Sequence, residues 1–241
     1  MTDRGRRLIV NADDFGQSAG ITRGIIHAAE HGLVTSTSLM VRGRDADAAA
    51  AYAKRHPRLS VGLHVDLGEW SCRDGAWELV YGVTDLDDSD TVRTELERQL
   101  ESFRDLVGMT PSHIDFHQHI HLREPVRSVS LELATVLNIP LRHFCSHVRY
   151  CGGFYGRTAE GAPLPELITP TALVGLIEGL PPGISEVSCH PAFEVDFDTV
   201  YRYERALELA TLCDPFVLAA PEGAGVRLCS FHDVTGLTKS R

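Results

Sequence analysis

The amino-acid sequence predicts an α/β fold in which about seven parallel strands alternate with helices and form a closed or nearly closed (β/α) barrel. Short apolar or β-branched runs alternate with helical patterns along the whole chain, as in parallel βαβ units. A length of 241 residues suits one such barrel. The alternative is an open, doubly wound sheet, but no G-x-G-x-x-G turn follows a predicted strand, which disfavours its dinucleotide-binding form.

The predicted strands are short runs rich in apolar and β-branched residues. In chain order they span 8–10, 33–41, 59–67, 113–121, 140–144, 184–190 and 225–231. The fourth, "HIDFHQHIH", fits extended backbone or a helix, because its histidines align at both spacings. Its place between two predicted helices favours the strand.

The predicted helices span 21–32, 45–57, 89–108, 125–139, 170–180 and 198–213. The clearest amphipathic pattern is 89–108, with Ser89 as a possible N-cap and Gly108 as a stop. Two segments, 68–88 and 150–169, fit neither pattern and are predicted to be irregular inserts. The whole chain, 1–241, is predicted to be a single domain.

Composition excludes several classes of function. Hydrophobic residues make up 43% and charged residues 23%, as in globular proteins. A net charge of −10 argues against nucleic acid as a partner. No stretch approaches the roughly 20 apolar residues of a membrane span. The six cysteines form no C-x-x-C pair, and together with the lack of a signal-peptide pattern they predict reduced thiols in a cytoplasmic protein.

Titratable residues gather at the predicted strand ends, which in a parallel barrel meet at one rim. They are Asp13, Asp14, His64, Asp66, His117, His119, His121, Arg142, His143, His190, His232 and Asp233. Singly, an aspartate pair is often a turn or cap, and a lone histidine is often a hydrogen-bonded core residue. Together they predict a site.

The chemistry of such a site follows from the residue types. One carboxylate and two neutral imidazoles can hold a divalent metal and leave positions open for water and substrate. Adjacent side chains on extended backbone point apart, so one of Asp13 and Asp14 can bind the metal while the other acts as a general base. A histidine opposite would donate a proton to the leaving group. These parts describe metal-assisted hydrolysis of an amide or ester.

A family resemblance adds to this reading. The segments "LIVNADDFG", "GIIHAAEHGLVTSTSLMV", "VGLHVDL", "PSHIDFHQHIH", "FYG" and "EVSCHPAF" resemble, in this order, the YdjC-like carbohydrate deacetylases, the family of the chito-oligosaccharide deacetylase. The resemblance runs from about residue 7 to "RLCSFHDV" near the C-terminus. It implies a distorted, TIM-barrel-like fold, one divalent metal ion, and removal of an N-acetyl group from an acetylated amino sugar or small glycoconjugate, with release of acetate.

The resemblance also implies roles for individual residues. Asp13 resembles the catalytic base, and Asp14, His64 and His117 resemble the metal ligands. His190 is the candidate proton donor or carbonyl stabiliser. The candidate substrate contacts or supporting residues are Arg142, Tyr155, His119 and His121.

The sequence leaves alternatives for the metal ion, the sugar contacts and the reaction. The ion is Mg²⁺ or Zn²⁺, with Mn²⁺, Co²⁺ and Ni²⁺ as alternatives, and a homodimer is compatible with the family. Phe116 stands where the family pattern has a small residue, and Trp70 and Trp77 in the 68–88 insert either stack on a sugar ring or pack the loop. The competing functions are another metallohydrolase, such as a phosphoesterase or cyclic amidase, and a non-catalytic sugar-binding protein.

Overall fold

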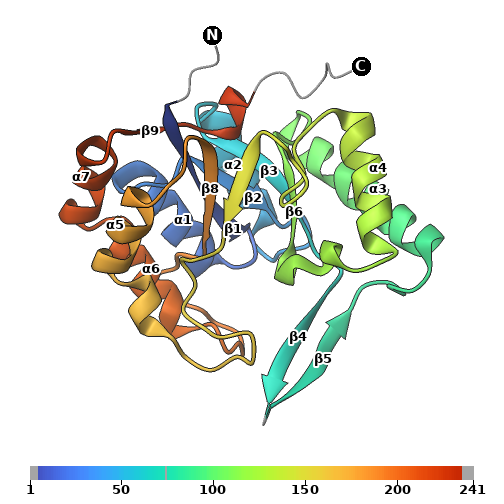
Figure 1. Ribbon diagram of the computed structural model, residues 1–241. Helices are drawn as coiled ribbons and strands as arrows, with labels where there is room; N and C mark the ends of the chain where they lie inside the picture. The colour runs from blue at the N-terminus through green and yellow to red at the C-terminus, as the bar shows by residue number, and fades with distance from the viewer. Residues whose placement is uncertain (1–4, 74, 235–241) are drawn as a thin grey trace.

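The computed structural model, which describes residues 5–73 and 75–234, has a curled parallel sheet at its centre (Figure 1). The strand order is β6-β3-β2-β1-β8-β7, and β9 also pairs with the first residues of β1. The strands are β1 (Arg6–Phe15), β2 (Ser36–Leu39), β3 (Ser60–Val65), β6 (Ile114–Phe116), β7 (Val148–Cys151), β8 (Gly183–Cys189) and β9 (Val226–Leu228). The predicted α/β fold, a distorted barrel, is confirmed; among the described residues β6 and β7 do not pair, so the curl stays open there.

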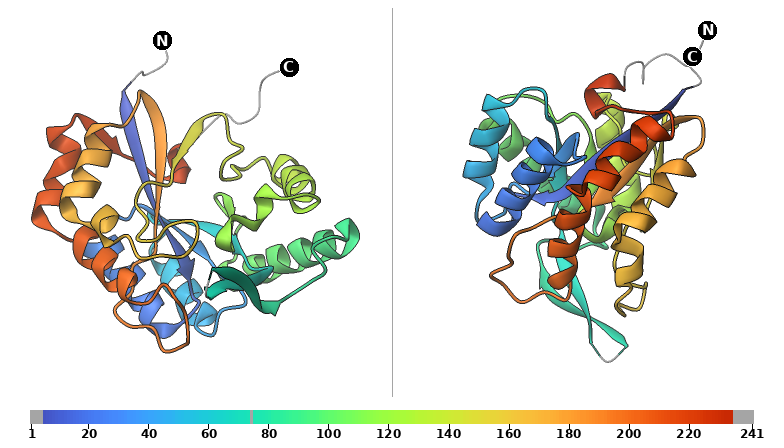
Figure 2. Two further views of the ribbon diagram at one scale, coloured as in Figure 1. Left: turned by 60° about the horizontal axis from the view of Figure 1, so that its bottom comes forward. Right: turned by 90° about the vertical axis from the view of Figure 1, so that its left-hand side faces the viewer.

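Helices cover the outer face of the sheet (Figures 1 and 2). They are α1 (Ala19–His31), α2 (Ala46–Arg55), α3 (Ser89–Val107), α4 (Val126–Leu137), α5 (Pro170–Glu178), α6 (Tyr203–Leu212) and α7 (Pro215–Gly223). Their apolar faces and the strands bury one large hydrophobic cluster that includes Phe15, Leu63 and Phe103. Helix α7 is absent from the sequence prediction. No helix in the described ranges has the length and apolar character needed to cross a membrane.

The histidine segment differs from its prediction. The strand ends at Phe116, and His117–Leu122 form a 3₁₀ helix, η1, in which Gln118 (φ 52°) and His119 (φ 53°) are left-handed. The Gln118 side chain explains the turn, because it donates to the carbonyl of Trp70 and accepts from the Trp70 amide, at 2.7 and 2.8 Å. A long-range contact thus replaces the strand that local alternation predicted.

The predicted strand 140–144 is also wrong. Only Leu141 makes a bridge, to Ile114, and the chain then turns at His143, which is left-handed (φ 70°). The next strand of the sheet is instead β7, whose last residues lie in the predicted insert 150–169. The rest of that insert has little regular structure apart from the 3₁₀ helix η2 (Pro165–Ile168).

The segment 68–88 contains a hairpin where an irregular insert was predicted. Strands β4 (Gly68–Arg73) and β5 (Ala76–Gly82) pair antiparallel as a separate two-stranded sheet. The hairpin follows β3 and extends away from the body of the molecule at the end where β1 terminates (Figure 1). It therefore stands beside the carboxyl ends of the parallel strands.

Candidate active site

A cavity of about 690 Å³ opens at the carboxyl ends of the parallel strands. Its wall includes the five residues assigned above to the metal and to proton transfer: Asp13, Asp14, His64, His117 and His190. Each lies at or just beyond the end of a different strand, except the two aspartates, which share β1. His232 and Asp233 follow β9, which pairs with the start of β1, and they lie outside this cavity.

A bulge in β1 lets two neighbouring aspartates face one cavity. The pairing of β1 with β2 shifts register between Ala12 and Phe15, and Asp14 is left-handed (φ 66°). Extended backbone would send the two side chains to opposite faces. The bulge brings both to the cavity, where each carboxylate has a different arginine as its partner.

Asp14 lies between two imidazoles. Its Oδ1 is 3.1 Å from Nε2 of His64 and 3.1 Å from Nδ1 of His117. One ligand atom from each of the three buried residues lies within 4.8 Å of the other two. The Nε2 of His117 is buried and has no hydrogen-bond partner among the described residues. This group can hold a divalent cation.

Asp115 orients His64 from behind. Its Oδ1 lies 2.7 Å from Nδ1 of His64, while its Oδ2 accepts from Ser38 and Asn11. Burial alone would lower the pKa of His64, but Asp115 and Asp14 raise it to about 10. Because a metal binds only the neutral ring, a cation and this proton compete for His64. A carboxylate behind a histidine is a common support for a metal ligand.

Asp13 is bound by Arg142 through two parallel hydrogen bonds. The distances are 2.6 Å from Nη1 to Oδ2 and 2.8 Å from Nη2 to Oδ1. Burial would raise the pKa of Asp13, but Arg142 lowers it, so this carboxyl is ionised at neutral pH. Arg142 also contacts Asp115 and Glu186, at 2.8 and 2.7 Å. The Arg142 side chain has no exposed area, so it holds the carboxylates of the site in place from the interior. This burial does not fit the substrate contact expected from the sequence.

Helix α6 supplies two site residues that the sequence analysis missed. Arg205 donates to Oδ2 of Asp14 at 2.6 Å. Burial would raise the pKa of Asp14, but Arg205 and His117 hold it well below its usual range. One turn along, Glu208 accepts a hydrogen bond from the backbone amide of His190. The sequence analysis placed both in the predicted helix 198–213 and gave neither a role, although each is buried.

His190 lies between Asp13 and Glu208. Its Nε2 is 3.8 Å from Oδ2 of Asp13, and its Nδ1 is 3.8 Å from Oε1 of Glu208. Burial lowers the pKa of His190, but the carboxylates of Glu208, Asp13 and Asp14 together raise it above its ordinary value, with Glu208 contributing most. The ring therefore retains a proton to higher pH than a free histidine does.

Of the other predicted site residues, two line the cavity and one is buried away from it. His119 and Tyr155 line the cavity, and the Tyr155 ring stacks on Tyr201 at 4.6 Å between centroids. His121 is fully buried and stacks on Phe116 at 4.8 Å. The large Phe116 ring, which stands where the family pattern has a small residue, therefore packs against His121.

The sequence matches a known protein family along most of its length. The chain matches the family model described as YdjC-like protein over residues 7–222. It is 33% identical to the chitooligosaccharide deacetylase of Serratia marcescens, over 94% of this chain and 98% of that protein. It is also 33% identical to the carbohydrate deacetylase of Geobacillus stearothermophilus, over 95% and 98%.

A solved structure shares the fold. A protein from Enterococcus faecalis V583, titled as a cellobiose-phosphate cleavage protein, superposes with a TM-score of 0.75 and 24% identity. The match covers 95% of this chain and 99% of that one. The two proteins therefore share one fold.

Proposed function

The chain belongs to the YdjC-like protein family, and from this we propose that it is a metal-dependent carbohydrate deacetylase. It would remove the N-acetyl group from an acetylated amino sugar or small glycoconjugate and release acetate. We also propose that residues 1–241 form a single domain and that the protein is cytoplasmic. Support comes from relatives named as deacetylases that align over nearly the whole chain. The observation that carries the proposal is the group formed by Asp14, His64 and His117.

This group fits one divalent ion. A carboxylate oxygen and two imidazoles suit Mg²⁺, Zn²⁺, Mn²⁺, Co²⁺ or Ni²⁺. Asp115 holds one nitrogen of His64, leaving the other toward Asp14. The bound ion would lower the pKa of a water molecule and polarise the acetyl carbonyl.

The protein side chains would move the protons. Asp13, kept ionised by Arg142, would accept the proton of the attacking water. His190, whose raised pKa favours the protonated ring, would donate to the departing amine nitrogen. Their separation of 3.8 Å allows both to act on one bound amide.

A phosphoesterase fits the charges less well. Phosphoester chemistry needs cationic side chains that are free to bind the phosphate oxygens. The arginines along the described part of the cavity wall, Arg123, Arg157 and Arg205, each pair with a carboxylate. A neutral N-acetyl sugar needs no such cation.

Aromatic side chains suit a sugar ring. Trp70 and Trp77 of the hairpin and Tyr155 after β7 line the cavity, and 56% of Trp77 is exposed. Such faces stack on the apolar side of a pyranose. We propose that the hairpin forms one wall of the sugar-binding region.

The direct test is acetate release from N-acetylglucosamine and its oligosaccharides before and after metal removal. We expect release by the metal-loaded protein, a fall of at least about 100-fold after chelation, and recovery when Zn²⁺ or Mg²⁺ is restored. Hydrolysis of p-nitrophenyl phosphate or a cyclic amide instead would favour the competing hydrolases. Sugar binding without any release would favour the non-catalytic alternative.

A second prediction concerns the pH dependence of kcat/KM. If protonated His190 is the acid, activity falls as pH rises through its pKa. Replacing Glu208 by Gln removes the charge that raises this pKa, so the falling limb should move to lower pH. Glu204→Gln is the matched control, since Glu204 lies on the same helix but pairs with Arg157.

The measurement is a pH profile of the wild type and both variants. A shift in Glu208→Gln but not in Glu204→Gln is expected. An unchanged limb in Glu208→Gln, with only a uniform loss of rate, would mean that Glu208 merely supports the fold around His190.

A further inference from the structure

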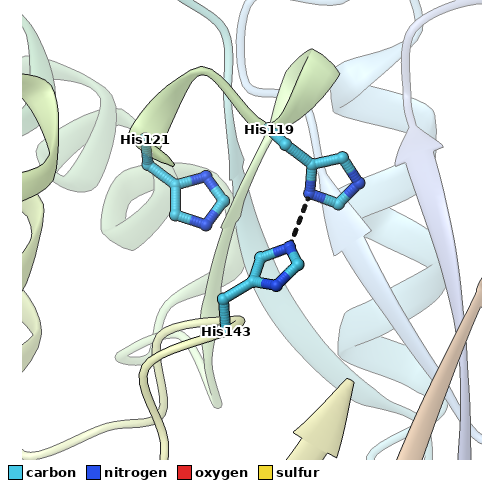
Figure 3. A group of neighbouring side chains, drawn as sticks. All are labelled: His119, His121 and His143. Carbon is cyan, nitrogen blue, oxygen red and sulfur yellow. Dashed lines mark hydrogen bonds between the residues drawn. The ribbon is translucent and has the colours of Figure 1, made fainter. Parts of the chain in front are cut away.

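Three histidines form a second cluster beside the cavity (Figure 3), which His119 and His143 line while His121 lies buried behind it. His119 and His121 lie in η1, and His143 follows the bridge residue Leu141. One nitrogen from each ring lies within 4.8 Å of the others. Figure 3 shows the edge of His121 that carries both nitrogens facing the other two rings.

The spacing of two of these rings is that of metal ligands. Nε2 of His143 lies 3.2 Å from Nδ1 of His119. Two imidazoles on a tetrahedral zinc-type ion, each with a bond of about 2.0–2.1 Å, hold their nitrogens about 3.3 Å apart. The present contact is a hydrogen bond between the rings, and an ion would take the place of its proton.

The third ring has an unused lone pair. Nε2 of His121 is 3.1 Å from the carbonyl oxygen of Arg142, so this nitrogen donates there. The neutral ring then carries its lone pair on Nδ1. That atom is buried and has no hydrogen-bond partner among the described residues, in a side chain with 0% exposure. A buried lone pair without a partner is costly unless something binds it.

Neighbouring groups hold two rings in place. The Arg142 carbonyl fixes His121, and the Tyr150 hydroxyl lies 3.3 Å from the other nitrogen of His119. Such outer contacts orient histidines that bind metals. His143 is exposed and His119 is half-buried, so an ion can enter from the cavity.

From this geometry we infer that His119, His121 and His143 bind a second metal ion, distinct from the one proposed at Asp14. The two groups of ligands share no residue, so no side chain of either group would bridge the two ions. Three imidazoles without a carboxylate select Zn²⁺, Cu²⁺, Ni²⁺ or Co²⁺ over Mg²⁺. The ligand of this site is therefore a zinc-type transition-metal ion.

The test counts Zn²⁺ bound by the full chain in equilibrium dialysis. Wild type should bind two ions, and His143→Asn should bind one. Asn suits the left-handed backbone at this position, so the substitution removes the imidazole without adding strain. His147→Asn is the matched control, an exposed histidine four positions away, and should still bind two.

A further variant separates this inference from the proposed function. Asp14→Asn should lose the first ion and keep the second, and the double variant with His143→Asn should bind none. The inference is overturned if wild type binds only an ion that Asp14→Asn removes. It is also overturned if His143→Asn binds as many ions as wild type, since the rings would then only hydrogen-bond to each other.

Discussion

Asp13→Asn is expected to lower kcat for acetate release by about 10²–10⁴-fold, the usual contribution of a general base. The amide has nearly the same shape as the carboxylate and can still accept from Arg142, but it cannot take a proton from water. The metal group uses Asp14 and not Asp13, so bound metal should be unchanged. Acetate release and metal content, measured on the same preparation, test the loss of kcat and the retention of the metal.

Asp14→Asn is the matched comparison for this prediction. It alters the neighbouring residue in the same bulge, and it should lose both the proposed catalytic metal and activity. Activity close to wild type in Asp13→Asn would assign the base elsewhere. Loss of metal in Asp13→Asn would contradict the division of roles between the two aspartates.

Arg142→Met is expected to lower the free energy of unfolding by about 3–5 kcal/mol. The guanidinium is fully buried and pairs with Asp13, Asp115 and Glu186. Even with it present, burial raises the pKa of Glu186 to about 7. Without it, three carboxyl groups would remain in the interior with their main counter-charge gone.

Urea denaturation of matched variants measures this effect. Arg142→Lys keeps the charge but loses the two parallel bonds to Asp13, so an intermediate loss is expected. Arg93→Met removes an exposed arginine that pairs with Glu132, and should cost far less stability than Arg142→Met. Equal losses for Arg93→Met and Arg142→Met would show that the buried network adds nothing to stability.

The rim of the site was predictable because parallel strands bring their carboxyl ends together. Asp13, His64 and His190 are distant in sequence, yet each follows an apolar run, and the structure places all three on one cavity wall. Their catalytic and metal-binding roles remain predictions. The fold class was likewise predictable, because the alternation of short strands with helices can be recognised without knowing which side chains contact one another.

The buried charges were not predictable by the same reasoning. Charged residues on a surface helix normally face water, so the helical pattern of 198–213 gave no sign that Arg205 and Glu208 belong to the site. They are buried because Asp14 and His190 meet them from distant parts of the chain. The same holds for Arg142, since a strand-end arginine gives no local sign that three carboxylates surround it.

The histidine segment shows the limit of local patterns in another way. Alternation predicted that His117, His119 and His121 would share one face of a strand. The side chain of Gln118 instead binds the backbone of Trp70 in the hairpin, and the chain turns through left-handed residues. The turn divides the histidines between two groups, one with Asp14 and one with His143.

The position of β1 in the sheet has a consequence for biosynthesis. This strand is synthesised well before β8 and β9, yet Leu8 pairs with Ser185 of β8 and Leu228 of β9. Pairing across such long loops is slow, and an apolar strand that waits for its neighbours is prone to aggregate. The nascent chain therefore carries β1 and its two aspartates without this partner until β8 has been made, so the aspartates meet His190 only after that point.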